Sequence, residues 1–195
     1  ANSSKVDLIT HQLVQFMEYD KYENVLSQSI TRYNPDGGAV LDYKVVTNSY
    51  DSLENDPNGL WKHKGWTAGS VSVTYTDIGM ETVVEKQVTI YTSYDKFGNA
   101  LNQEVTKYAE DEATLTSFRT IENSYVDLIN DPSGVWQRLG QVAGAITHNY
   151  TSEDKTVIIN SSETKYTSYD DYGNVLGQET TNIAATGEII SKKTI

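Results

Sequence analysis

The sequence has no cysteine, and it contains only three prolines and two methionines among its 195 residues. Without cysteine there is no disulfide framework and no thiol chemistry. Cations are scarce too, because 15 lysines and arginines stand against 27 acidic residues, for a net charge of −12. A chain this acidic lacks the clustered cations that bind a phosphate backbone, so we predict no nucleic-acid partner. No apolar run approaches the roughly 18 residues of a membrane helix, so we also predict no membrane insertion.

What the sequence does contain is an internal repeat of 75 residues. Residues 16–90 align with residues 91–165 without a gap at 24 identical positions, and residues 91–108 match residues 166–183 at 11 of 18. We therefore divide the chain into a lead-in at 1–15, repeat unit 1 at 16–90, repeat unit 2 at 91–165, and a partial unit 3 at 166–195. Because unit 3 stops partway through a copy, we expect the chain to be a piece of a longer array.

Composition and turn spacing predict an all-β fold. Threonine (22 residues) and tyrosine (14 residues) are abundant, and both favour pleated, half-buried strands. We expect an elongated antiparallel tandem-repeat array built from hairpins, with about four strands per unit. In unit 2 these strands fall near 99–110, 114–127, 144–152 and 156–169. Helix is nearly absent, and residues 6–18, whose spacing is loosely helical, align with 81–93 and are also predicted as strand.

A tight-turn motif, Tyr-Asp-x-x-Gly-Asn, marks the junction between two strands. Glycine supplies a positive φ, asparagine tolerates one, and the aspartate can accept backbone N–H groups in an Asx turn. In the first copy Glu23 takes the glycine position, so we expect that turn to be looser. The predicted structural turn residues are Tyr19, Asp20, Tyr94, Asp95, Gly98, Asn99, Tyr169, Asp170, Gly173 and Asn174.

All tyrosines and phenylalanines fall into columns that repeat between units. We interpret these seven columns as the core and the ladder between units, because each aromatic buries a large area and can pair across strands. The columns are 16/91/166, 19/94/169, 22/97/172, 33/108, 43/118, 50/125 and 75/150. Trp61 and Trp136 form an eighth column, whereas Trp66 aligns with Gln141. These three tryptophans remain candidates for ligand contact.

The titratable residues give no catalytic pattern. His11, His63 and His148 do not recur between units, and none stands in a metal-ligand spacing. The acids that do recur, Asp20/95/170, Asp56/131 and Glu104/179, lie mostly at turns, where a backbone role is favoured over a glycosidase pair.

Calcium is the alternative for the acidic loop at residues 51–58, because carboxylates and carbonyls are its ligands. Asp51 and Glu54 become Val126 and Ile129 in the second copy, which weakens that ligand set. We therefore predict no catalytic residue, no metal site and no cofactor, and a protein that is not an enzyme.

The motif Tyr-Asp-x-x-Gly-Asn-x-Leu, at residues 94–101 and 169–176, resembles the tyrosine-aspartate (YD) repeats of the RHS family. That resemblance implies a giant bacterial surface or secreted protein, and hence an extracellular location. It also implies antiparallel sheets that spiral into shells or serve as cell-contact scaffolds. The 75-residue period and the block Asn-Asp-Pro-x-Gly-x-Trp are not part of the family's pattern.

Two functions remain open from the sequence. The first is a non-catalytic structural module, a stalk or shell wall, whose partners are the neighbouring repeats of the same chain. The second is an adhesin-type binding repeat that recognises a cell-surface glycan or protein. The second function predicts exposed aromatic or acidic residues at equivalent places in each unit, above all around the three tryptophans.

Overall fold

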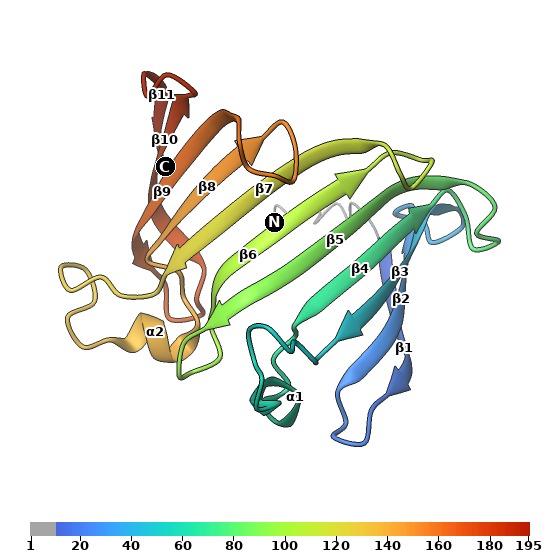
Figure 1. Ribbon diagram of the computed structural model, residues 1–195. Coiled ribbons are helices and arrows are strands. Elements are labelled where there is room, and N and C mark those ends of the chain that lie inside the picture. Colours follow the sequence, from blue (N-terminus) through green and yellow to red (C-terminus); the bar gives the residue numbers. More distant parts are fainter. Residues whose placement is uncertain (1–10) are drawn as a thin grey trace, which may run out of the picture.

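The computed structural model describes residues 11–195, which form one open antiparallel sheet of 11 strands (Figure 1). Each strand from β2 to β10 pairs with the strands before and after it in the chain, so the sheet is a continuous meander. The predicted all-β antiparallel fold is confirmed. The strands are β1 His11–Tyr19, β2 Val25–Tyr33, β3 Val40–Ser49, β4 Gly69–Tyr75, β5 Val83–Tyr94, β6 Ala100–Tyr108, β7 Leu115–Ser124, β8 Gly144–Tyr150, β9 Ile158–Tyr169, β10 Val175–Ala184 and β11 Ile189–Thr194.

Two single-turn helices interrupt this meander, α1 (Leu60–Lys64) between β3 and β4 and α2 (Val135–Leu139) between β7 and β8. The elements β6, β7, α2, β8 and β9 each begin 75 residues after β2, β3, α1, β4 and β5. The division into units stays a prediction. Its boundaries at residues 16, 91 and 166 fall inside β1, β5 and β9, and residues 1–10 of the lead-in lie outside the described part of the chain.

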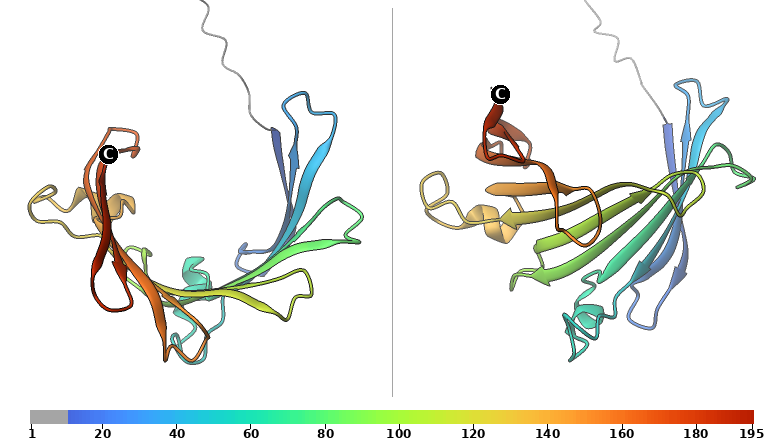
Figure 2. Two further views of the ribbon diagram at one scale, coloured as in Figure 1. Left: turned by 90° about the horizontal axis from the view of Figure 1, so that it is seen from above. Right: turned by 45° about the horizontal axis from the view of Figure 1, so that its top comes forward.

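The sheet bends into an open trough with β1 and β11 as its two rims (Figure 2). Eleven strands at about 4.8 Å each give a path of roughly 50 Å across the sheet. No second sheet covers either face among the described residues, and burial is therefore local. The most buried apolar side chains are Phe118 and Val105 within the sheet, and Trp61, Trp136, Tyr125, Ala68 and Ala143 around the helices.

The aromatic columns pack in part as predicted. Tyr43 and Tyr75 face each other on β3 and β4 with ring centroids 6.5 Å apart, and Phe118 and Tyr150 do so on β7 and β8 at 5.8 Å. The prediction that column 22/97/172 belongs to a core is wrong. Phe97 is 43% exposed and Tyr172 is 92% exposed, because both lie at the tips of turns rather than within strands.

An irregular register precedes each Tyr-Asp turn. The strand pairing shifts between Phe16 and Tyr19, between Tyr91 and Tyr94, and in the matching part of β9 and β10. Regular alternation would send residues three apart to opposite faces. The irregularity instead brings the rings of Tyr91 and Tyr94 to 5.9 Å, and the local bend re-aims the second tyrosine toward the neighbouring helix.

Candidate functional site

Tight turns and long loops alternate along one end of the strands, because every second connection of a meander lies at the same end. The tight turns are residues 20–24, 95–99 and 170–174, and the long loops are residues 50–68 and 125–143, which carry α1 and α2. We call these five segments the turn–helix row. Figure 1 shows both helices at this end of the sheet.

Each tight turn is held by its own aspartate. In the middle turn one carboxylate oxygen of Asp95 accepts the backbone N–H groups of Phe97 (2.9 Å) and Asn99 (3.0 Å). The second oxygen accepts the side-chain amide of Asn99 at 2.9 Å. Burial opposes ionisation of Asp95, but these hydrogen bonds outweigh it and hold the pKa of that carboxyl below its usual value. The predicted Asx turn is therefore confirmed.

The first turn is no looser than the others, contrary to the prediction made from Glu23. Asp20 accepts from Tyr22 and Asn24 as its counterparts do, and Glu23 donates its backbone N–H to the Asp20 carbonyl at 3.1 Å. Glu23 adopts φ of 67° to close the turn. The aspartate bonds thus impose the geometry even where a side chain makes the left-handed conformation costly.

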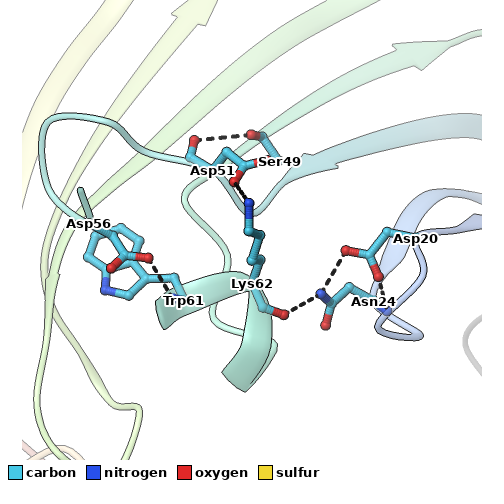
Figure 3. Close-up of polar contacts among 7 residues, drawn as sticks. All are labelled: Asp20, Asn24, Ser49, Asp51, Asp56, Trp61 and Lys62. Carbon is cyan, nitrogen blue, oxygen red and sulfur yellow. Dashed lines mark hydrogen bonds and ion pairs between the residues drawn. The ribbon is translucent and has the colours of Figure 1, made fainter. Parts of the chain in front are cut away.

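The asparagine that ends each turn also contacts the next helix. The side-chain amide of Asn24 donates to the backbone carbonyl of Lys62 in α1 at 2.7 Å, as Figure 3 shows. The amide of Asn99 donates in the same way to the carbonyl of Gln137 in α2 at 2.6 Å. These carbonyls lie in the last turn of their helices, where intrahelical i to i+4 partners are missing, although that of Gln137 also accepts the N–H of Gly140 at 3.5 Å. The turn therefore caps the helix that follows it by 38 residues.

The loop before each helix is fixed by a buried aspartate. A side-chain oxygen of Asp56 accepts the backbone N–H of Trp61 at 2.6 Å, and Asp131 accepts that of Trp136 at the same distance. Asp56 and Asp131 are 8% and 5% exposed. The block Asn-Asp-Pro-x-Gly-x-Trp is thus a folding element: Gly59, at φ of 66°, opens the helix and Asp56 satisfies one of its free N–H groups.

Each buried tryptophan packs on the tyrosine of the following turn. Trp61 meets Tyr94 edge to face at 4.9 Å, and Trp136 meets Tyr169 at 5.0 Å. The Tyr94 hydroxyl donates to the carbonyl of Thr67 at 2.6 Å. The Tyr169 hydroxyl donates likewise to that of Val142 at 2.6 Å. Burial, with the nearby tyrosines, raises the pKa of Tyr169 to about 12.

One Tyr-Asp-x-x-x-Asn turn therefore serves two helices. Tyr94 packs against the tryptophan of α1, while Asp95 and Asn99 hold α2. Gln137 strengthens the second contact, because its side-chain amide donates to Asp95 at 3.0 Å. The turn at residues 95–99 consequently links α1 to α2 along the row.

Trp66 departs from this symmetry as the sequence indicates. Its ring stacks on Tyr94 at 5.3 Å, and its indole covers Gly98 so closely that a Cβ there would lie 2.5 Å from the indole nitrogen. In the second copy Gln141 takes the place of Trp66 over Gly173. Trp61 and Trp136 are 6% and 9% exposed, and Trp66 is half-buried. Ligand contact by these three tryptophans stays a prediction.

A second surface near α2 escaped the sequence analysis. Val126, Leu128 and Ile129 are 53%, 75% and 82% exposed and border an open hollow of about 700 Å³. The hollow is also lined by Glu122, Glu163 and Lys165. In the first copy the loop carries Asp51 and Glu54 at the places of Val126 and Ile129. This change from acidic to apolar residues between the two copies is the sequence signal by which the surface could have been predicted.

Most aspartates of the row are engaged in local bonds. Asp51 pairs with Lys62 at 2.7 Å, and the aspartates of the turns and loops accept backbone N–H groups (Figure 3). Over residues 11–195, no three His, Asp or Glu side chains gather in a way that could hold a metal ion. The geometry of the row holds helices in place.

Comparison of the chain with protein-family models finds no match, and comparison with curated proteins finds none either. Within the described part of the chain, none of the helices has the length and apolar character needed to cross a membrane.

Proposed function

We propose that this chain is a structural repeat module, a wall or stalk segment of a large extracellular protein, without catalytic activity. The observation that carries the proposal is the turn–helix row. Its turns at residues 20–24 and 95–99 repeat one contact to the helix that follows, and the turn at 95–99 also joins α2 to α1 through Tyr94. Such nearest-neighbour contacts give a stability that sums over units, as in other repeat proteins.

The edges of the sheet support the same proposal. Among the described strands, β1 and β11 each pair on one side only, and β1 exposes Leu13, Val14, Phe16 and Met17 by 41–56%. Unpaired edges are templates for further strands. The resemblance to YD repeats of the RHS family agrees with a curved sheet that encloses space, and an extracellular location follows from that resemblance alone.

Small-angle X-ray scattering on a lengthened chain tests this function. The lengthened chain carries a second copy of residues 91–165 inserted after residue 165. If units continue one sheet, the scattering thickness of the particle stays that of a single layer while its lateral size grows. If the added unit folds back, a second layer adds about 10 Å to the thickness, and the scaffold function is wrong.

The adhesin-type alternative is favoured by one observation, the exposed apolar loop at residues 126–129. It predicts saturable binding to a glycan or protein that the double substitution Leu128→Ser, Ile129→Ser abolishes while the unfolding midpoint stays unchanged. The matched control is Leu53→Ser, which alters an exposed leucine of the first copy. Binding that survives the double substitution would contradict this alternative.

A further inference from the structure

The third turn has the geometry of a helix-holding turn but holds no helix among residues 11–195. Asp170 accepts the backbone N–H groups of Tyr172 and Asn174, and the Asn174 amide donates to Asp170 at 2.8 Å. In the first two turns the equivalent amide reaches a helix carbonyl as well. At Asn174 the described residues supply no such carbonyl.

The apolar side chains around this turn are uncovered in the same way. Tyr172 is 92% exposed, whereas its counterpart Phe97 is 43% exposed, and Tyr22 is half-buried and meets the ring of His63 at 4.4 Å. Leu176 is 61% exposed, whereas Leu26 and Leu101 are half-buried. The surface that a loop and helix cover at the first turn, and cover in part at the second, is thus bare at the third.

The neighbouring edge of the sheet is open as well. β11 pairs with β10 on one side and has no strand on the other within the described range. Its counterparts β3 and β7 pair with β4 and β8, which directly follow α1 and α2. A loop, a helix and a strand would therefore fit together onto the third turn and the edge of β11.

The charge of the third turn indicates which kind of loop, helix and strand would bind there. Lys21 and Lys96 follow the aspartate in the first two turns, whereas Asp171 follows Asp170 in the third. The third turn thus carries a net charge of −2, against −1 in the first turn and 0 in the second, which favours a cation near the helix carbonyl it holds. The segment around α1, with Lys62, His63 and Lys64, has this character and the histidine that packs on a turn tyrosine.

We propose that the third turn, with Tyr172, Leu176 and the edge of β11, is a docking site for the loop, helix and strand of a further repeat unit. The helix it accepts carries a basic residue near its C-terminus. This inference rests on the proposed scaffold function and adds the site and the sequence character of the incoming unit. Asn174 caps the incoming helix, and the strand extends the sheet by backbone hydrogen bonds.

The test uses the full chain and a synthetic peptide of residues 48–75, which supplies the loop, helix and strand of the first copy. We expect saturable 1:1 binding that shifts the nuclear magnetic resonance signal of the Asn174 side-chain amide. Asn174→Ala should weaken binding about tenfold, the cost of one lost hydrogen bond. Tyr172→Ala, at a position too exposed to affect folding, should weaken it as well.

Two control peptides check the specificity. A peptide with Lys62→Glu and Lys64→Glu should bind at least about tenfold more weakly, because it presents anions to Asp170 and Asp171. A scrambled peptide should not bind. Equal binding of all three peptides, shifts confined to β11, or no saturation in the millimolar range would each overturn the inference.

The scattering experiment separates this inference from the proposed function. If the peptide fails to bind while the lengthened chain keeps single-layer thickness, the docking site is wrong and the scaffold stands. If the lengthened chain folds back into two layers, the scaffold function is wrong whatever the peptide does.

Discussion

At the scale of single residues, the asparagine that ends each turn is the most informative position, because the chain contains its own control. Asn99 holds both Asp95 and the carbonyl of Gln137, whereas Asn174 holds Asp170 alone among the described residues. The two side chains therefore differ by one contact, the capping of a helix. The difference between the stability losses on replacing Asn99 and Asn174 therefore measures the capping contact, with no separate reference protein.

We expect Asn99→Ala to lower the free energy of unfolding by about 1 kcal/mol more than Asn174→Ala does, since only the first removes a hydrogen bond to a helix carbonyl. Urea unfolding of both variants beside the unchanged chain measures the difference. Equal losses would contradict the assignment of Asn99 as the cap of α2.

The fourth position of each turn, occupied by Glu23, Gly98 or Gly173, tolerates a side chain only where the covering residue leaves room for a Cβ. Gly98 and Gly173 have φ of 90° and 84°, so an added Cβ is strained at both, but the indole of Trp66 lies only over Gly98. In the first turn Glu23 is accommodated at φ of 67°. The residue at this position is therefore set both by backbone conformation and by the covering side chain.

We predict that Gly98→Ala destabilises the protein more than Gly173→Ala, by roughly 1–3 kcal/mol, the cost of overpacking. Trp66→Gln, which reproduces the second copy, should remove most of this excess in the double variant. Thermal unfolding of the four variants tests the coupling. If Trp66→Gln leaves the excess unchanged, the clash with Trp66 is not its cause.

At the scale of elements, the sequence predicts the strands and turns well. Alternating β-branched and aromatic residues mark the strands, and the strands predicted near 99–110, 114–127, 144–152 and 156–169 contain β6 to β9. The Tyr-Asp-x-x-Gly-Asn motif marks the turns because aspartate, glycine and asparagine act on their own backbone.

The helices and their partners were not predictable in the same way. α1 and α2 have five residues each, too few for a helical hydrophobic period to show. Their contacts with Asn24 and Asn99 go to backbone carbonyls, which every residue type presents and which therefore leave no sequence signal. The strand irregularity that re-aims Tyr94 also has no residue signature of its own.

The turns should make the protein sensitive to acid. Hydrogen bonds hold the pKa of Asp20, Asp95 and Asp170 below the usual aspartate value. A carboxyl whose pKa is lower in the folded state stabilises fully above its unfolded pKa of about 3.9, and this stabilisation is lost as the pH falls through the folded value.

We therefore expect the unfolding midpoint in urea to be constant near neutral pH and to fall below about pH 4. Asp95→Asn should be less stable at pH 7, and its midpoint should fall less between pH 4 and pH 2. A variant that loses stability in acid as steeply as the unchanged chain would show that Asp95 carries none of the effect.

At the scale of the whole molecule, an open sheet of 11 strands stays ordered without a second layer because its stabilising contacts run along the sheet. The buried tryptophans lie at one end of the strands, and each connects its helix-bearing loop to the end of the next long strand, β5 or β9. Net charge of −12 opposes unspecific association at the open edges. A further repeat unit can still add to the sheet, because the turn–helix row binds it by specific contacts.

The central claim is that successive units share stabilising contacts, and the dependence of stability on length tests it most directly. We would measure guanidinium unfolding of the chain and of the chain lengthened by a second copy of residues 91–165. Shared contacts predict a single transition with a higher midpoint for the longer chain, because each added unit brings an interface as well as itself. An unchanged midpoint with only a larger signal would mean that the units fold independently, and would contradict the account.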